Sequence, residues 1–460
     1  MARAATLAVP VVVLAVVVAL GVTTWQRGDL NRFICDGGCG PSNVIAPDRL
    51  ALDAVPTVEA PAGVDDGRLD PAKVEAAVTA GLSDAALGSR VGFAAMAPDG
   101  TTFTSEADRA YTPASTTKVL TGFAALRTID PGTRFTTKVV RSADGVVLVG
   151  GGDPYLSTKP ARSVDDRVFQ ADLTTLARRT AGSLKQAGTT SVRLGVDASL
   201  FAGPDVSPTW EPDYVTANIV TPVSALWADE GVIDGIRDRD PAAGAARAFA
   251  RLLTQEGITV TGDPAAAEAP PDAPVLGEVR SATLAQIVET LIRVSDNEAA
   301  EVVLRHVAIA AGRTADFDGG TAAVRAALDD AGIATDGLVL NDGSGLSRDN
   351  RIIPTTLVGT LRAAHASPRT SGLLSDLSVS GFTGTLVDRF AQLAGARGAV
   401  RAKTGTLSGI HSLAGYLTDA DGRPVFFAVM ADRTDRDMPV QAQAALDRVA
   451  AALAECSCGA

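Results

Sequence analysis

Three short motifs occur in this chain in a fixed order, and a long stretch separates the first from the second. A Ser-x-x-Lys sequence begins at Ser115, a Ser-Asp-Asn sequence at Ser295 and a Lys-Thr-Gly-Thr sequence at Lys403. Ser295 follows Ser115 by 180 residues (295 − 115), and Lys403 follows Ser295 by 108 (403 − 295). Each motif alone arises by chance in many proteins. Together they predict one site built from three distant segments, with a separate folded unit between the first two.

The residue types in these motifs suit nucleophilic attack by a serine. A serine hydroxyl is a poor nucleophile at neutral pH and needs a base within hydrogen-bond reach. Lys118 lies one helical turn after Ser115, so it can be that base if burial and the nearby Lys403 cation lower the pKa of its ammonium. Ser295 can then relay a proton to the leaving nitrogen. Asn297 can hold the amide of the substrate.

The third motif has the composition of a strand that binds an extended peptide with a free carboxylate. Gly405 has no Cβ, so a substrate backbone can approach the edge of the strand there. Lys403 and the hydroxyls of Thr404 and Thr406 can bind the carboxylate. The backbone N–H groups of Ser115 and Thr406 are the expected oxyanion hole.

The apolar pattern predicts a catalytic domain of the α/β (α+β) class. Residues 115–126 predict a buried helix with Ser115 in its first turn, and residues 284–307 predict another with the Ser-Asp-Asn motif in or beside it. An antiparallel sheet flanked by N- and C-terminal helices, with a helical subdomain opposite, is the implied layout. Its strands are expected at 92–96, 400–407, 412–417 and 424–430.

We expect the catalytic domain to be discontinuous, comprising residues 68–135 and 280–460. Residues 136–279 are expected to form an inserted α/β domain, which begins with a β-hairpin around the Asp-Gly turn at 144–145. Residues 1–28 are read as a membrane anchor or signal segment. Residues 29–67, rich in Pro, Ala and acids, are read as a flexible linker.

Composition limits the classes of partner. The 460-residue chain has a net charge of −12, and its Lys and Arg residues are dispersed, which disfavours a nucleic-acid partner. No motif calls for a cofactor or a metal. The glycines at 150–152 lack the Gly-Lys-Ser/Thr continuation of a phosphate-binding loop, so they are expected to form a tight turn.

The N-terminus predicts export. Residues 4–25 carry no charge, and as a helix of 22 residues they would span roughly 33 Å, enough to cross a bilayer core. Trp25 and Arg27 stand where interface anchors are usual. The alternative is a cleaved signal peptide, with Ala19 and Gly21 as its cleavage site. We expect a single-pass membrane protein whose catalytic domain lies outside the cytoplasm.

The four cysteines lie near the two ends of the chain. An even number in an exported protein predicts disulfides, and four cysteines allow three pairings. We expect a link between the N- and C-terminal pairs, because a Cys-x-Cys pair is awkward to close on itself. A zinc site made of all four is the alternative. The cysteines are Cys35, Cys39, Cys456 and Cys458.

Beyond its three motifs, the chain resembles the D-alanyl-D-alanine carboxypeptidase/endopeptidase family of low-molecular-mass class C penicillin-binding proteins with a large inserted domain. The resemblance covers about residues 70–450. It implies the serine β-lactamase/transpeptidase-like fold for the catalytic domain. It rests on the segments ASTTK at 114–118, LVGGGDP at 148–154, PVSAL at 222–226, DGSGLSR at 342–348, GTL at 384–386, AKTGTL at 402–407 and LAGY at 413–416.

This resemblance implies an activity and further site residues. It implies a Ser115 acyl-enzyme that releases terminal D-alanine from peptidoglycan stem peptides, with cleavage of D,D cross-links in some members and slow acylation by β-lactams. It also implies that Arg348 binds the free end of a diaminopimelate side chain and that Trp210 and Asp213 line the same pocket. The insert is shorter here than in relatives, many of which have a cleaved signal instead of an anchor.

Two other functions compete with this one. A β-lactamase would need a deacylation base such as the class A glutamate, and no such motif stands between Ser115 and Ser295. A non-catalytic module that binds the cell wall or senses β-lactams is disfavoured, because every motif residue expected to take part in catalysis is present.

Overall fold

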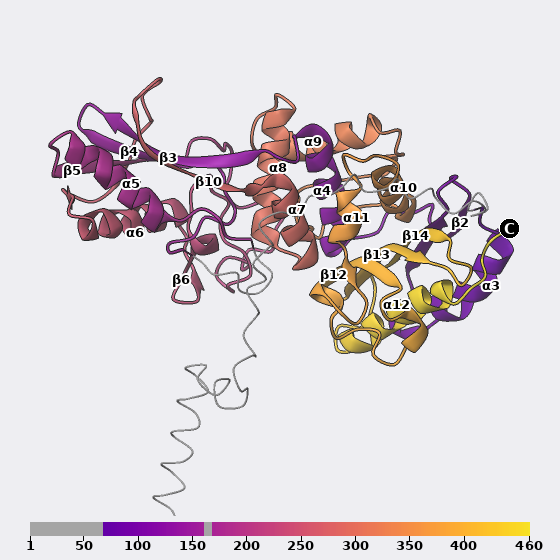
Figure 1. The fold of residues 1–460 in the computed structure, drawn as a ribbon. Coiled ribbons are helices and arrows are strands. Elements are labelled where there is room, and N and C mark those ends of the chain that lie inside the picture. Colours follow the sequence, from indigo (N-terminus) through magenta and orange to yellow (C-terminus); the bar gives the residue numbers. More distant parts are fainter. Residues whose placement is uncertain (1–67, 161–167) are drawn as a thin grey trace, which may run out of the picture. The chain divides into compact units, whose positions relative to one another are not determined.

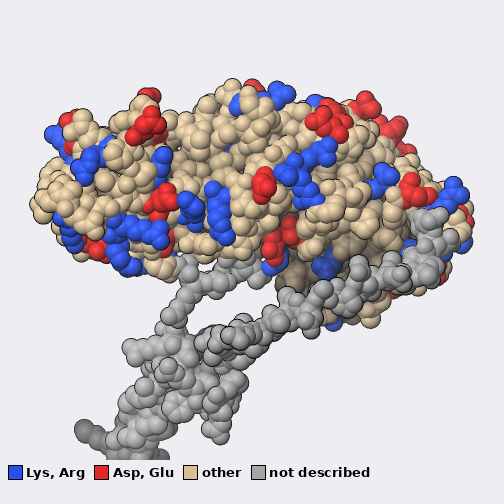
Figure 2. Space-filling view, turned by 45° about the horizontal axis from the view of Figure 1, so that its top comes forward, with Lys and Arg blue, Asp and Glu red and all other residues tan. Residues whose placement is uncertain are grey.

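The computed structural model describes residues 68–160 and 168–460, which belong to one compact unit, Val64–Ala460 (Figure 1). The expected anchor, the linker and Cys35 and Cys39 lie outside the described residues. Within the part that is described, no helix is long and apolar enough to cross a membrane. On the face shown in Figure 2, basic and acidic side chains are interspersed.

A six-stranded antiparallel sheet carries the third motif. Its strand order is β11-β12-β13-β14-β1-β2. The first strand of this order, β11, pairs with β12 only at Arg401 and Ala402, so among the described strands none covers the outer edge of β12 from Lys403 onward. The strands are β1 (Val91–Met96), β2 (Thr102–Ser105), β11 (Ser378–Val379), β12 (Val400–Leu407), β13 (Ile410–Thr418) and β14 (Pro424–Ala431).

Apolar residues cover both faces of this sheet because side chains alternate along each strand. In β14, Phe427 packs into a cluster with α3 (Pro71–Leu82) and α12 (Pro439–Ala454), the two terminal helices. Its neighbours Phe426 and Ala428 pack into a second cluster on the opposite face. The sheet therefore lies between two helical layers, as the sequence predicts.

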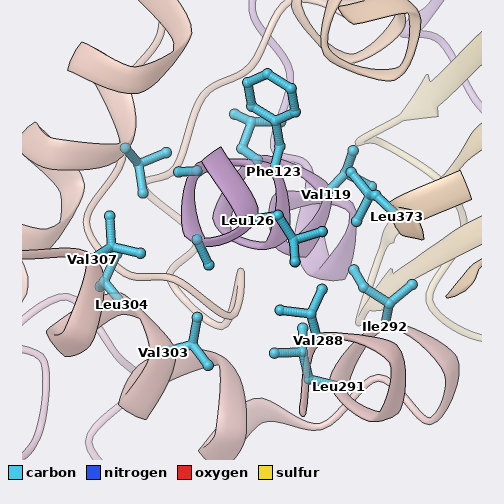
Figure 3. Packing of buried hydrophobic residues seen from close by; sticks show 14 of the residues in the cluster. Val119, Phe123, Leu126, Val288, Leu291, Ile292, Val303, Leu304, Val307 and Leu373 are labelled. Carbon is cyan, nitrogen blue, oxygen red and sulfur yellow. The ribbon is translucent and has the colours of Figure 1, made fainter. Parts of the chain in front are cut away.

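The second layer is built around α4 (Thr117–Thr128), the helix that follows Ser115. Every residue from Thr117 to Leu126 is buried. Figure 3 shows Phe123 and its neighbours among side chains of the surrounding helices. Those helices are α7 (Leu284–Arg293), α8 (Asn297–Ala310), α9 (Phe317–Asp329), α10 (Pro354–His365) and α11 (Gly372–Asp376).

The helix predicted over 284–307 is in fact two helices. The first ends at Arg293, and the second begins at Asn297. The Asp296 carboxylate accepts a hydrogen bond from Ala299 N at 2.9 Å and so caps the second helix. Ser295 has a φ of 62°, which no α-helix permits, and the chain turns there. The second motif therefore lies at a helix junction.

A second sheet lies within residues 134–283. Its order is β10-β3-β4-β5-β8, with β9 paired to β5. The predicted hairpin is present as β3 and β4, whereas β5 runs parallel to β4. The helices α5 (Leu173–Gln186) and α6 (Pro241–Gln255) share its apolar core. Its strands are β3 (Arg134–Ser142), β4 (Gly145–Val149), β5 (Ser191–Asp197), β8 (Thr259–Val260), β9 (Ala265–Ala266) and β10 (Val275–Thr283).

The C-terminal cysteines form a disulfide with each other, so the expected end-to-end link is wrong for this pair. Cys456 is bonded to Cys458, and their Cα atoms are 5.0 Å apart. Helix α12 ends at Ala454, and the chain turns behind it, which brings the two α-carbons into the usual range for a disulfide. A turn can therefore close a ring as short as that of a Cys-x-Cys pair.

Candidate active site

Lys118 brings together residues from three segments of the chain. Ser115 lies in a short 3₁₀ turn, Ala114–Thr116, and Lys118 lies in the first turn of α4. The Lys118 Nζ donates to Ser115 Oγ at 3.0 Å, to Asn297 Oδ1 at 2.8 Å and to the Ser344 carbonyl at 2.7 Å. The side chain is fully buried. The predicted nucleophile and base are therefore in direct contact.

A second lysine–serine pair comes from the other two motifs. The Lys403 Nζ donates to Ser295 Oγ at 2.8 Å and to the Thr404 carbonyl at 2.9 Å. Lys403 is also fully buried. The backbone of Ser295 is left-handed, which costs on the order of 1–3 kcal/mol. With this backbone, the Ser295 hydroxyl contacts the Lys403 amine.

Burial sets the protonation of both lysines. It lowers the pKa of Lys118 to about 8, against the opposing charges of Glu301 and Asp342. Burial, and next the neighbouring Lys118 cation, hold the pKa of Lys403 well below its usual range. We expected burial and the nearby Lys403 cation to lower the pKa of Lys118. In the structure, burial is the main cause for both lysines, and the neighbouring cation acts on Lys403, whose pKa the Lys118 charge lowers further.

Two glycines enclose the segment that carries Ser115. A Cβ on Gly405 would lie 2.1 Å from Ser412 Oγ and 2.5 Å from the Pro113 carbonyl oxygen. A Cβ on Gly345 would lie 1.9 Å from the Ala114 carbonyl oxygen, and its φ of 87° disfavours any side chain. From the sequence we expected the missing side chain of Gly405 to let the substrate backbone approach the strand. In the structure it leaves room for the segment that carries Ser115.

The remaining threonines of the third motif lie on β12 where its outer edge is open. The Thr404 hydroxyl donates to Thr385 Oγ1 at 2.9 Å, and the Thr406 residue is exposed. Thr385 belongs to a short 3₁₀ turn, Gly384–Leu386. We did not predict Thr385 as a site residue, although the Gly-Thr-Leu segment at 384–386 was a signal for it.

Comparison with known proteins agrees with this geometry. The chain matches the model of the D-Ala-D-Ala carboxypeptidase 3 (S13) family over residues 74–236 and 234–453. It belongs to the S13 family. A carboxypeptidase of Mycobacterium tuberculosis is 37% identical over 369 residues, covering 75% of this chain and 76% of the relative. Carboxypeptidase DacB of Mycolicibacterium smegmatis is 34% identical over 434 residues, covering 89% and 92%.

Solved structures agree on the fold. Penicillin binding protein 4 from Haemophilus influenzae superposes with a TM-score of 0.67 at 22% identity, covering 81% of this chain and 98% of that protein. The α/β class and the family resemblance drawn from the sequence are therefore confirmed.

The S13 resemblance also implied three residues outside the motifs. Arg348, with 31% of its side chain exposed, donates to the Ser408 carbonyl at 3.1 Å and pairs with Glu211 at 3.0 Å. Trp210 is 5% exposed, and its indole N–H donates to Asp342 Oδ2 at 2.8 Å. Asp213 is exposed. Arg348 thus borders the end of β12, whereas the burial of Trp210 leaves it little surface for a ligand.

Proposed function

We propose that this chain is a serine D-Ala-D-Ala carboxypeptidase that trims peptidoglycan stem peptides through a Ser115 acyl-enzyme, with D,D-endopeptidase activity on cross-links and acylation by β-lactams at the same serine. One observation carries the proposal: the Ser115 hydroxyl lies 3.0 Å from the buried Lys118 amine in a chain of the S13 family. A buried amine with a lowered pKa is a competent base.

The proposed chemistry assigns one task to each motif. Neutral Lys118 accepts the Ser115 proton as Oγ attacks the carbonyl of the penultimate D-alanine. Backbone N–H groups of Ser115 and Thr406 stabilise the oxyanion. Ser295, held by Lys403, then relays the proton from Lys118 to the leaving nitrogen as the C–N bond breaks and terminal D-alanine departs. Lys118, neutral again, takes a proton from the water that attacks the ester and returns it to Ser115 Oγ.

The open edge of β12 is the proposed place for the substrate backbone. An extended peptide can add to an uncovered strand edge through main-chain hydrogen bonds. Thr404 and Thr406 stand on that strand, and Lys403 precedes them, so a terminal carboxylate at this end has the two threonine hydroxyls and the Lys403 amine as donors. The Oδ1 of Asn297 accepts from Lys118. Its Nδ2 group is the proposed donor that orients the substrate amide.

Defined muropeptides test the activity. The purified protein should release D-alanine from a monomeric pentapeptide, and mass spectrometry of cross-linked dimers should report any endopeptidase products. The Ser115→Ala variant, which lacks the proposed nucleophile, is the negative control. A wild-type protein that leaves both substrates intact while still reacting with penicillin would support a β-lactam-sensing module instead.

The pH dependence of acylation tests the role of Lys118. The base must be neutral, and the neutral fraction grows as pH rises through a pKa of about 8. We expect the second-order rate constant for acylation by penicillin to rise about tenfold per pH unit below this value and to level off above it. Stopped-flow rates between pH 6 and 9.5 measure this. A flat profile would exclude Lys118 as the base.

Arg348 is the proposed specificity residue. A guanidinium pairs well with a carboxylate, and in this structure it already holds that of Glu211. Arg348→Ala should lower kcat/KM by roughly 5- to 150-fold for stem peptides with a free diaminopimelate end. Acylation by a simple penicillin should not change, and Arg109→Ala, at an exposed surface pair, should match wild type on both. Equal losses on both substrates would assign Arg348 to the fold.

We also propose the location and domain division of the chain. The uncharged run at 4–25 supports an uncleaved anchor, followed by a linker to 67, with the enzyme outside the cytoplasm. A separate sheet and apolar core support an inserted domain at 136–279 between the catalytic segments 68–135 and 280–460. N-terminal sequencing of the membrane-bound protein decides between the anchor and a cleaved signal.

A further inference from the structure

The Ser344 carbonyl, which accepts from Lys118, belongs to a loop whose backbone N–H groups donate to two buried carboxylates. The first is Glu301 of α8, which accepts from Ser344 N at 2.8 Å and from Gly343 N at 3.1 Å. Glu301 is fully buried. The loop also lies tightly on this helix, because a Cβ on Gly343 would be 2.9 Å from Leu304 Cβ. The position of the Ser344 carbonyl therefore depends on these contacts.

The second carboxylate is that of Asp342, which accepts hydrogen bonds from groups of its own segment. Its Oδ1 accepts from Gly345 N at 3.0 Å and from Asn350 Nδ2 at 2.6 Å, and its Oδ2 accepts from Ser347 N at 2.6 Å. Asp342 is fully buried. The same Oδ2 accepts from the Trp210 indole at 2.8 Å. Among the hydrogen bonds of the described residues, this is the one donor to Asp342 that comes from outside the 342–350 segment.

Trp210 is itself held in place. Its ring meets the Phe317 ring edge-on at 5.6 Å, and the Arg305 guanidinium lies 4.0 Å from the centre of Phe317 on α9. Rigid packing of this kind fixes the direction of the N–H group. The indole thus connects the 134–283 region to the Asp342 carboxylate through a directional hydrogen bond. The Arg348–Glu211 ion pair is a second link between this region and the 342–350 segment.

We propose that Trp210 is a positioning residue for Lys118: its indole N–H fixes the Asp342 carboxylate, the carboxylate fixes the 342–347 loop, and the loop fixes the Ser344 carbonyl on the catalytic amine. The inference rests on the proposed role of Lys118 as the base. It gives the inserted region a part in catalysis that does not require contact with substrate. A hydrogen bond to a charged group is among the stronger ones in proteins, and losing a buried one leaves the carboxylate unsatisfied.

The charged groups around Lys118 decide how its titration responds. Those facing it are Lys403 on β12, Glu301 and Glu298 on α8, Asp296 at the helix junction, and Asp342 on the loop. Loosening the loop admits water to the amine and relieves its desolvation. The ascending limb of the acylation profile should then move to higher pH. A substitution that merely weakens the fold leaves this limb where it is.

The test compares two buried tryptophans. Trp210→Phe keeps most of the ring and removes the N–H group. Trp227→Phe is the matched control, because Trp227 is 1% exposed and its indole N–H donates at 3.1 Å to the Pro154 carbonyl. We expect Trp210→Phe to acylate with penicillin roughly 10-fold more slowly than wild type, with its ascending limb shifted upward. Trp227→Phe should keep the wild-type acylation rate and the wild-type pH dependence of that rate. The melting temperatures of the two variants should fall by similar amounts.

A second variant separates loss of the N–H group from loss of packing. Benzothienylalanine at position 210 retains the size of indole and lacks only the donor, so it should reproduce the slower rate and the shifted limb. If the variants at positions 210 and 227 had the same acylation rate and the same pH dependence of that rate, the inference would be overturned. The proposed Ser115–Lys118 mechanism would be unaffected. If instead Ser115→Ala protein still forms an adduct in the same assay, the proposed function fails independently of Trp210.

Discussion

Replacing Ser115 with alanine should abolish covalent labelling by a fluorescent penicillin and reduce carboxypeptidase turnover to background. Ser115 is the described serine whose hydroxyl meets the Lys118 amine, at 3.0 Å. Removing the nucleophile of a serine hydrolase costs on the order of a million-fold in kcat. Intact mass and peptide mapping of the wild-type adduct should place it on the peptide that contains Ser115.

Two controls make this result specific. Ser199→Ala, at an exposed position just after β5, should react with the fluorescent penicillin as the wild type does. The Ser115→Ala protein should melt close to the wild-type temperature, because the substitution removes one partially exposed hydroxyl. Labelling that persists in a folded Ser115→Ala protein would mean that another residue is the nucleophile.

Replacing Gly345 with alanine should destabilise the protein and remove most of its reactivity with penicillin. The new Cβ would lie 1.9 Å from the Ala114 carbonyl oxygen and 2.9 Å from Thr117 Oγ1. The positive φ costs about 1–3 kcal/mol for a residue with a side chain, and overpacking typically adds another 1–3. The chain can relieve the clash only by moving the Ser115 turn or the 342–347 loop, and either movement separates Lys118 from its partners.

Gly182→Ala is the matched substitution. Gly182 lies inside α5, and a Cβ there would meet nothing within 4 Å, so alanine should stabilise the helix by roughly 0.5–1 kcal/mol. Urea unfolding and penicillin acylation of both variants measure the two effects. A Gly345→Ala protein as stable and as reactive as wild type would contradict the packing described for the serine turn.

The sequence was most informative where short motifs carry the chemistry. Spacing within Ser-x-x-Lys predicts the contact between Ser115 and Lys118, because three residues make about one helical turn. The helical layers on both faces of the sheet were likewise foreseeable, since a continuous apolar run such as 425–430 marks a strand with two buried faces. The order of the motifs, together with the family resemblance, predicted that Ser295 and Lys403 join the same site.

Other features depended on tertiary context. The break between α7 and α8 was missed because the apolar period continues through it, and only the cap at Asp296 and the strained Ser295 reveal it. Glu301 has no local signature: a carboxylate inside an apolar helix acquires its role from a loop more than 40 residues away. The disulfide prediction was wrong for the same reason: it depended on tertiary context, because the turn after α12 brings Cys456 and Cys458 together.

The pairing of β3 with β10 bears on the order in which the chain folds. β1 must find β14, and their central residues, Phe93 and Val429, are far apart in the sequence, a separation that slows folding. Because β3 pairs with β10, Arg134 lies opposite Thr283, and the 148 residues between them (283 − 134 − 1) drop out of the loop that remains to be closed. An insertion that folds first thus shortens the loop that the first sheet must close, and a substitution that prevents the pairing of β3 with β10 would delay closure of the sheet that carries Lys403.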